Sequence, residues 1–140
     1  MRFMIIGKAA EDPGALPDPQ QIEEMNKFTD ELIAAGVLLG YEGLHPSSKG
    51  ARVRFSGKDL IVTDGPFTET KELIAGYYIW KVNSLAEAIE WVKRSPNLGP
   101  GEIEIRQIFE PEDFAYGFSE EEIEKEKQIR AQLAEQAAKK

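Results

Sequence analysis

The chain has 140 residues, 41% of them hydrophobic, and its formal net charge is −8; this composition predicts a globular protein with an apolar core. Without cysteine and with a single histidine, His45, the sequence excludes disulfides, thiolate chemistry, Cys-based metal sites and sites that need two imidazoles. The acidic charge disfavours binding to nucleic-acid backbones. Because the sequence has neither a signal-peptide layout nor an apolar run near ~20 residues, we expect a cytoplasmic protein without a membrane segment. We also expect no metal, cofactor or nucleic-acid partner.

The N-terminal part of the chain is predicted to form a strand, a helix and a second strand. Residues 2–7 read RFMIIG and are apolar on both faces, which is typical of a strand covered on two sides. Asp18 is a good N-cap, Pro19 suits the first helical position, and Gln21 occupies the capping-box position. Apolar residues then recur at three-to-four spacing until a glycine ends the helix, and residues 37–41 follow as a short strand.

The middle of the chain is predicted to form a β-hairpin that leads into a constrained loop. Two alternating segments flank residues 56–59, so that Val53 and Phe55 share a face with Leu60 and Val62.

The apolar run 60–62 stops at residues 64–67, DGPF, where glycine accepts positive φ and proline fixes its own φ. We therefore expect Asp64 to lie where a buried strand ends and a constrained loop begins, a common place for a functional side chain.

The following segment completes the expected domain. One helical turn is predicted at residues 69–73, a long strand at 74–82, a helix from Ser84 with Glu87 in the capping-box position, and a last strand at 103–109. Two helices on one face of an antiparallel sheet constitute the ferredoxin-like α+β fold, which is the fold class we expect.

The aromatic strand indicates what covers the other face of the sheet. Tyr77 and Ile79 lie on one face of this strand, while Tyr78 and Trp80 lie on the other. An aromatic side chain buries ~150–250 Å², and monomers rarely expose apolar patches above a few hundred Å². We therefore expect a second copy of the sheet to cover the open face, which gives a symmetric homodimer.

The C-terminal tail is predicted to form a helix with a capping box from Ser119 to Glu122. Its apolar stripe is thin, so the helix either packs on a partner subunit or stays partly solvated. The expected organisation is therefore a domain of residues 1–110 and a C-terminal helical extension of residues 111–140.

Several motifs, in this order, resemble the DGPF branch of the YCII-related domain family. They read GLHPSSKGARV at 43–53, DGPF at 64–67, ETKE at 69–72, AGYY at 75–78 and EAIEW at 87–91.

The resemblance implies a ferredoxin-like fold, a dimeric α/β-barrel-like assembly and a cleft between sheet and loops, without an established reaction. It also implies a regulatory context, since some members are associated with extracytoplasmic-function sigma factors. The wider family has a histidine–aspartate pair associated with its first helix. This helix has Asp30 but no histidine, so that pair is not carried over.

Asp64 and His45 are the candidate catalytic residues. A desolvated carboxylate has a raised pKa and an imidazole titrates near neutrality, so the two could act as acid and base. The commoner alternatives are that Asp64 anchors the Gly-Pro turn and that His45 is an ordinary loop residue.

The candidate ligand-binding residues combine cations with a carboxylate: Arg52, Arg54, Lys71, Glu72 and Arg106. Guanidinium groups hold anions by bidentate contacts, although in an acidic protein they more often pair with local carboxylates, as Arg106 would with Glu104. Tyr78 and Trp80 could stack on a ligand, but aromatics on a central strand more often form core or interface.

Two functions remain open at this point. The first is a dimeric module that binds a small molecule or a protein partner, in a regulatory, sigma-factor-associated context. The alternative is a small-molecule enzyme that uses Asp64, with or without His45, as acid and base in a dimer cleft.

Overall fold

The computed structural model describes residues 1–11, 18–68, 73–96, 101–114 and 116–139, and the chain divides into two units, Met1–Gln107 and Ile108–Lys140. The elements in chain order are β1 Arg2–Ala9, α1 Pro19–Ala34, β2 Leu38–Gly43, the 3-10 helix η1 Ser47–Lys49, β3 Ala51–Ser56, β4 Asp59–Asp64, β5 Leu73–Lys81, α2 Leu85–Lys93, β6 Glu102–Gln107, the 3-10 helix η2 Pro111–Phe114 and α3 Glu120–Ala138.

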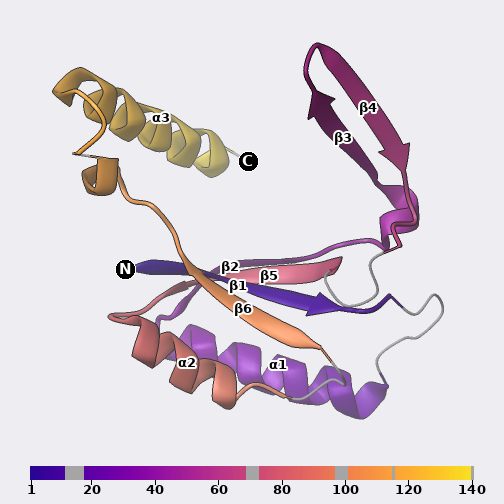
Figure 1. Ribbon diagram of the computed structural model, residues 1–140. Helices are drawn as coiled ribbons and strands as arrows, with labels where there is room; N and C mark the ends of the chain where they lie inside the picture. Colours follow the sequence, from indigo (N-terminus) through magenta and orange to yellow (C-terminus); the bar gives the residue numbers. More distant parts are fainter. Residues whose placement is uncertain (12–17, 69–72, 97–100, 115, 140) are drawn as a thin grey trace. The chain divides into compact units, whose positions relative to one another are not determined.

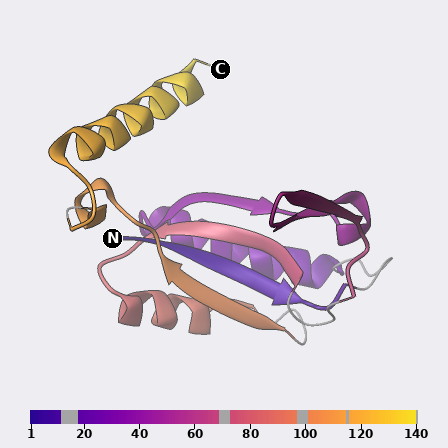
Figure 2. The ribbon, with the colours of Figure 1, turned by 45° about the horizontal axis from the view of Figure 1, so that its top comes forward.

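The first unit is built on a four-stranded antiparallel sheet in the order β2-β5-β1-β6. Helices α1 and α2 lie on one face of this sheet (Figure 1), and Figure 2 shows β1 between β5 and β6. This is the strand order of the ferredoxin-like fold, so the predicted fold class is confirmed. Strands β3 and β4 form a separate two-stranded sheet, inserted between the second and third strands of that fold.

The two helices begin where the sequence predicts. Asp18 Oδ1 accepts a hydrogen bond from the Gln21 N–H at 2.8 Å, and Gln21 Oε1 accepts one from the Asp18 N–H at 3.0 Å, which completes a capping box. Ser84 Oγ accepts from the Glu87 N–H at 3.1 Å, but Glu87 Oε2 accepts from the Asn83 N–H instead of that of Ser84. In this second capping box the return hydrogen bond therefore comes from the N–H of Asn83, one residue before the N-cap.

The core of the first unit lies between the helix layer and the sheet. Its buried side chains come from both layers: Phe3, Ile5, Phe28, Leu32, Val37, Trp80, Val82 and Ala88. Phe28 from α1 meets Trp80 from β5 edge-on, with ring centroids 6.2 Å apart. Leu73 opens β5 rather than closing a helical turn, and the remaining residues of that predicted turn, 69–72, lie outside the described ranges.

The hairpin has the predicted register but not the predicted burial. Val53 pairs with Val62 and Phe55 with Leu60, as alternation predicts. Every residue of β3 and β4 is exposed, and Phe55 keeps 79% of its surface accessible. The expectation that residues 60–62 form a buried strand is therefore wrong, because no second layer among the described residues packs on this hairpin.

The open face of the four-stranded sheet has an apolar centre and an ionic edge. Its half-buried centre consists of Met4, Ile6, Tyr77 and Ile79, which pair across β1 and β5.

The ionic edge of the same face is formed by β1 and β6. Lys8 Nζ lies 3.0 Å from Glu104 Oε1 and 3.4 Å from Glu102 Oε1, and Arg106 lies 3.2 Å from Glu104, which confirms the predicted Arg106–Glu104 pair. These contacts, first the hydrogen bond from Lys8 and then that from Arg106, hold the pKa of Glu104 below its ordinary value.

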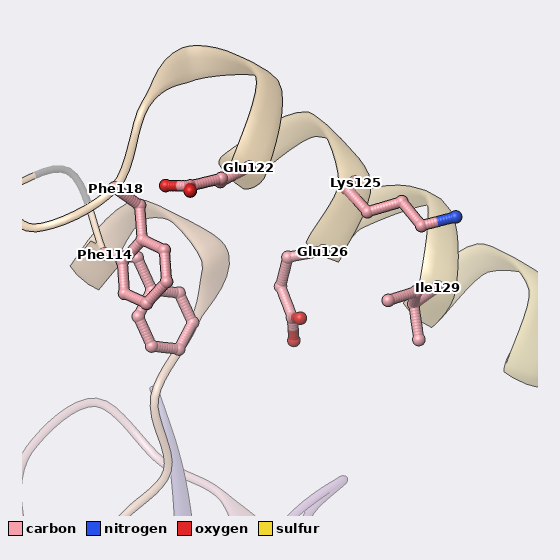
Figure 3. A pocket seen from close by; sticks show the side chains of 6 residues that line it. All are labelled: Phe114, Phe118, Glu122, Lys125, Glu126 and Ile129. Atoms are coloured by element: carbon pink, nitrogen blue, oxygen red, sulfur yellow. The ribbon is translucent and has the colours of Figure 1, made fainter.

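The second unit is a capped helix with a small aromatic cluster. Ser119 and Glu122 form the predicted capping box, and Glu126 pairs with Arg130 at 3.2 Å. Phe114 from η2 lies edge-on to Phe118 at 5.0 Å, beside a pocket of about 180 Å³ that α3 also lines (Figure 3). Within the described part of the chain, no helix combines the length and apolar character that crossing a bilayer requires.

The helix layer allows a direct test of the core. Leu32 is fully buried, whereas its neighbour Ile33 is 60% exposed on the same helix. We expect Leu32→Ala to lower the free energy of unfolding by about 2–5 kcal/mol, and Ile33→Ala to change it by less than about 0.5 kcal/mol. Urea unfolding followed by circular dichroism measures both, and equal effects would contradict the packing described.

Candidate functional site

The loop after β4 docks on the loop before β3 through Ser47. The Phe67 N–H donates to Ser47 Oγ at 3.0 Å, and the Gly65 N–H donates to the Gly50 carbonyl at 3.0 Å. A Cβ at Gly65 would lie only 1.6 Å from the Ser47 carbonyl oxygen. Glycine is therefore required here because two backbones approach closely.

A third segment joins this loop cluster through Glu11. The Glu11 carboxylate accepts hydrogen bonds from both the N–H and the Oγ of Ser47, the latter at 2.7 Å. On the other side of the loop, the Arg52 guanidinium lies 3.9 Å from the centroid of the Phe67 ring, a cation–π contact. Ser47 therefore joins three segments, and its hydroxyl group both donates a hydrogen bond, to Glu11, and accepts one, from the Phe67 N–H.

The two predicted catalytic residues flank this cluster and are both exposed. His45 precedes η1 and Asp64 ends β4. Among the described residues, the structure has neither a hydrogen bond nor an ion pair between them, and the Asp64 carboxylate has no such partner at all. The described residues therefore also show no side-chain hydrogen bond through which Asp64 would anchor the Gly-Pro turn.

The predicted ligand-binding residues lie apart in the structure. Arg52 stacks on Phe67, Arg54 is exposed on β3, and Arg106 pairs with Glu104 on β6. Lys71 and Glu72 lie outside the described residues. None of the three arginines lines the large cavity of this unit.

That cavity, of about 730 Å³, lies between the helix layer and the sheet. Aliphatic and aromatic side chains from α1, α2 and the four strands form most of its wall, among them Ile5, Met25, Phe28, Tyr41, Tyr78, Trp80, Val92 and Ile103. Its lining also includes exposed residues, such as Tyr41 and Glu42, so the cavity reaches the molecular surface.

The cavity exists because of the register of three strands. Gly43 of β2, Gly76 of β5 and Gly7 of β1 stand opposite one another, on the face of the sheet that the helices cover. One row further along, Tyr78 stands opposite Ile5, and beyond it Trp80 stands opposite Phe3. On these three strands the side chains facing the helices therefore become smaller until only glycine remains, while Ile103 of β6 stands opposite Gly7.

The space above this glycine row is open at Gly7 and Gly43 but not at Gly76. A Cβ at Gly7 would meet nothing closer than 3.7 Å, and one at Gly43 would meet nothing within 4 Å. Only at Gly76 does the backbone demand glycine, since a Cβ would lie 2.7 Å from the Glu42 carbonyl oxygen. Gly43 is exposed on the edge strand and Gly7 is half-buried, so this end of the sheet is open, and a molecule can lie against the backbone there.

The side chains that line the cavity carry few polar groups, and the one without a partner is out of reach of a water molecule. Trp80 is 1% exposed, and its Nε1–H finds no hydrogen-bond acceptor among the described residues. The Thr29 hydroxyl donates to the Met25 carbonyl at 2.8 Å, so its proton is already used. Burial raises the pKa of the Tyr78 phenol, and a hydrogen bond with Thr29 opposes this shift.

The sequence contains a signal for this site that lies outside its motifs. Gly7 and Gly76 lie on predicted strands, whereas Gly43 follows the predicted strand 37–41 and belongs to β2 only in the structure. The pairing of the strands is what shows that the three glycines form one row. Trp80 is a core residue, as the sequence favours, and it is also part of the cavity wall. Over the described ranges, no cluster of three or more histidine or acidic residues is close enough to hold a metal ion.

Comparison with known proteins gives two matches. Residues 1–112 match the YCII-related domain. A protein of Rhizobium meliloti (strain 1021), described as uncharacterised, is 32% identical over 93 residues, which cover 65% of this chain and 75% of that protein.

The loop cluster predicts a sharp contrast between two glycines. Gly65→Ala places its Cβ on the Ser47 carbonyl, and we expect it to lower the free energy of unfolding by about 1–3 kcal/mol because the backbones must separate. Gly50→Ala is the matched control: its Cβ would lie 3.6 Å from the same oxygen at an extended φ of −119°, and we expect a change below about 0.5 kcal/mol. Chemical denaturation compares the two, and a tolerated Gly65→Ala would refute the close approach.

Proposed function

The chain belongs to the YCII-related domain family, and we propose that it is a dimeric module that binds a small molecule in the cavity between its helices and its sheet. The observation that carries this proposal is the cavity of about 730 Å³ itself, with a wall of mostly aliphatic and aromatic side chains from the helices and the sheet.

The dimensions and lining of the cavity support binding of a small molecule. Ligand sites typically enclose about 300–1,000 Å³, with mostly apolar walls and a few polar groups that orient the ligand. The cavity has this composition, with aromatic and aliphatic residues from both layers and a few polar side chains, among them Thr29 and Tyr78.

The apolar face of the hairpin supports dimerisation. Val53, Phe55, Leu60 and Val62 share this face, and each is more than half exposed. Together they form an apolar patch of a few hundred Å², comparable with the largest patches on monomers. A stable interface buries about 800 Å² per subunit, so the hairpin face supplies about half of what a dimer needs. The open sheet face, with Met4, Ile6, Tyr77 and Ile79, can provide the rest.

An acid–base reaction at Asp64, with or without His45, stays an alternative prediction. Both residues are exposed and neither lines the cavity, so no contact of these two residues favours catalysis. The DGPF branch, the sigma-factor-associated context, the cytoplasmic location and a domain boundary at residue 110 also remain predictions.

Cavity binding can be tested by filling the space above the glycine row. Nile red, a neutral apolar dye whose fluorescence rises in apolar surroundings, is the probe. We expect Gly7→Leu to weaken its binding at least about tenfold, because the new side chain projects into the cavity, and Gly7→Ala to weaken it much less. If both variants bind the dye as the wild type does, with unchanged thermal stability, the cavity is not the binding site.

The dimer can be tested on the hairpin. We expect the wild type to be dimeric by light scattering at micromolar concentration, and Phe55→Ser to raise the dissociation constant at least about tenfold, because it removes the most exposed apolar side chain of the proposed interface. Lys58→Ser in the hairpin turn is the control and should leave the constant unchanged. A monomeric wild type would refute the dimer.

A further inference from the structure

We infer that a second copy of the chain packs on the open face of the four-stranded sheet with its strands reversed, so that the end of each sheet that carries cations covers the end of the other that carries carboxylates. This inference rests on the dimer of the proposed function and specifies which faces meet and in which orientation. It is carried by the rows of residues across the sheet, by the charges at the two ends of those rows, and by the position of the hairpin.

The strand register arranges the open face in rows that cross the sheet. In the two central rows, Ile79 stands opposite Met4 and Tyr77 stands opposite Ile6. All four side chains are half-buried, and they point away from the helices because the alternate residues of the same strands form the core. An apolar centre with charged residues around it is the usual composition of a protein–protein interface.

Cations gather at one end of this face. Arg2 stands opposite Lys81 in the row beyond Met4, and Arg106 stands opposite Met4 itself. We call Arg2, Lys81 and Arg106 the basic end. Like charges directly opposite each other destabilise a sheet, so negative charge from another molecule would stabilise this end.

Carboxylates gather at the opposite end. Glu42 and Glu104 lie at the two sides of the second central row, and Glu102 lies in the row beyond it. We call Glu42, Glu102 and Glu104 the acidic end. Lys8 lies among them with its side chain only 12% exposed, and its ammonium group is 3.0 Å from Glu104 and 3.4 Å from Glu102. These three carboxylates outnumber that single cation, so the end is negative.

The separated charges decide how a second copy can lie on the face. Two sheets packed face to face lie about 10 Å apart, with their strands within about 30° of one another. If the strands of the two copies ran the same way, Lys81 would lie over the partner's Arg2. Glu42 would likewise lie over the partner's Glu104, and like charges brought together in an interface are costly. With the strands reversed, Arg106 lies over the partner's Glu104, and each basic end faces an acidic end.

The position of Arg106 suits a contact between subunits. Its side chain is 72% exposed, and one of its terminal nitrogens donates to Glu104 Oε2 at 3.2 Å, while Lys8 contacts Oε1 of the same carboxylate. A guanidinium group has five N–H donors in a planar fork. Arg106 can therefore keep this bond and also bind a carboxylate above the face, as charge-assisted pairs commonly do.

The hairpin extends the same interface. In Figure 1, β3 and β4 rise from the first unit on the side of the sheet away from the helices. They leave the sheet where β2 ends and β5 begins, which is the acidic end, because Glu42 lies next to the last residue of β2. A second copy on the open face therefore lies beside the hairpin, whose apolar face adds to the area that the two copies can bury. With the strands reversed, the two hairpins lie at opposite ends of the dimer.

The orientation can be measured as a distance between spin labels in the full chain, which has no cysteine of its own. Lys81→Cys places one nitroxide on the basic end of each copy. We expect the two labelled positions to lie about 20–25 Å apart, since about six residues of strand and one sheet spacing separate them. Strands running the same way would bring them to about 10–12 Å. Double electron–electron resonance detects the longer distance, and broadening of the continuous-wave spectrum detects the shorter one.

A charge exchange tests the contact itself. We expect Arg106→Glu to raise the dissociation constant of the dimer at least about tenfold, because it places carboxylates over carboxylates. Adding Glu104→Arg to the same chain exchanges the two charges, and it should return the constant to within about threefold of the wild type. Lys27→Glu makes the same change of charge at an exposed position of α1 and should leave the constant unchanged. Sedimentation equilibrium measures all four proteins.

The outcomes separate the orientation from the dimer itself. In a dimeric protein, a label distance of about 10–12 Å, or one well beyond that of two packed sheets, would overturn the inference and leave the proposed dimer standing. An Arg106→Glu variant that dimerises like the wild type would overturn it equally. A monomeric wild type would refute both, whereas binding in the cavity is decided by Nile red alone. If Glu104→Arg prevents folding, the label distance decides, because Lys81 is exposed and lies outside the core.

Discussion

The antiparallel pairing of β1 with β5 is the constraint on which the rest of the first unit depends. A single register places Phe3 opposite Trp80 and Gly7 opposite Gly76. The first pair fills the space under the helices and forms the core, whereas the second pair leaves that space empty. The core and the cavity therefore lie at the two ends of the same β1–β5 pairing. A slip of β1 by one residue would turn Phe3 and Gly7 to the open face of the sheet.

Much of the fold can be predicted from local patterns. The caps at Asp18, Ser84 and Ser119 mark the beginnings of the three long helices, and strand alternation gives the hairpin register. The burial of the hairpin could not be predicted in the same way, since an alternating strand has the same pattern whether its apolar face is covered or exposed. Whether the apolar face of a strand is covered depends on other segments or on other molecules, so the strand's own pattern cannot predict it.

The candidate site was less predictable, because it depends on residues that are distant in sequence. In the DGPF motif, attention falls on the ionisable Asp64, yet the position that the structure constrains most is Gly65, whose partner is the Ser47 carbonyl. Glu11 could not be connected to Ser47 at a separation of 36 residues. The glycine row likewise needs the pairing of three strands before it can be recognised.

The insertion of the hairpin between β2 and β5 bears on how the chain folds. These two strands are neighbours in the sheet, yet residues 44–72 separate them, and closing so long a loop is entropically unfavourable. The β3–β4 hairpin has a short turn at Gly57, so it can form within microseconds from local contacts alone. Once formed, it places Gly50 beside Gly65 and shortens the effective loop that the sheet must close. The β3–β4 hairpin thereby lowers the effective contact order of the β2–β5 pairing. We expect the hairpin to form before the four-stranded sheet.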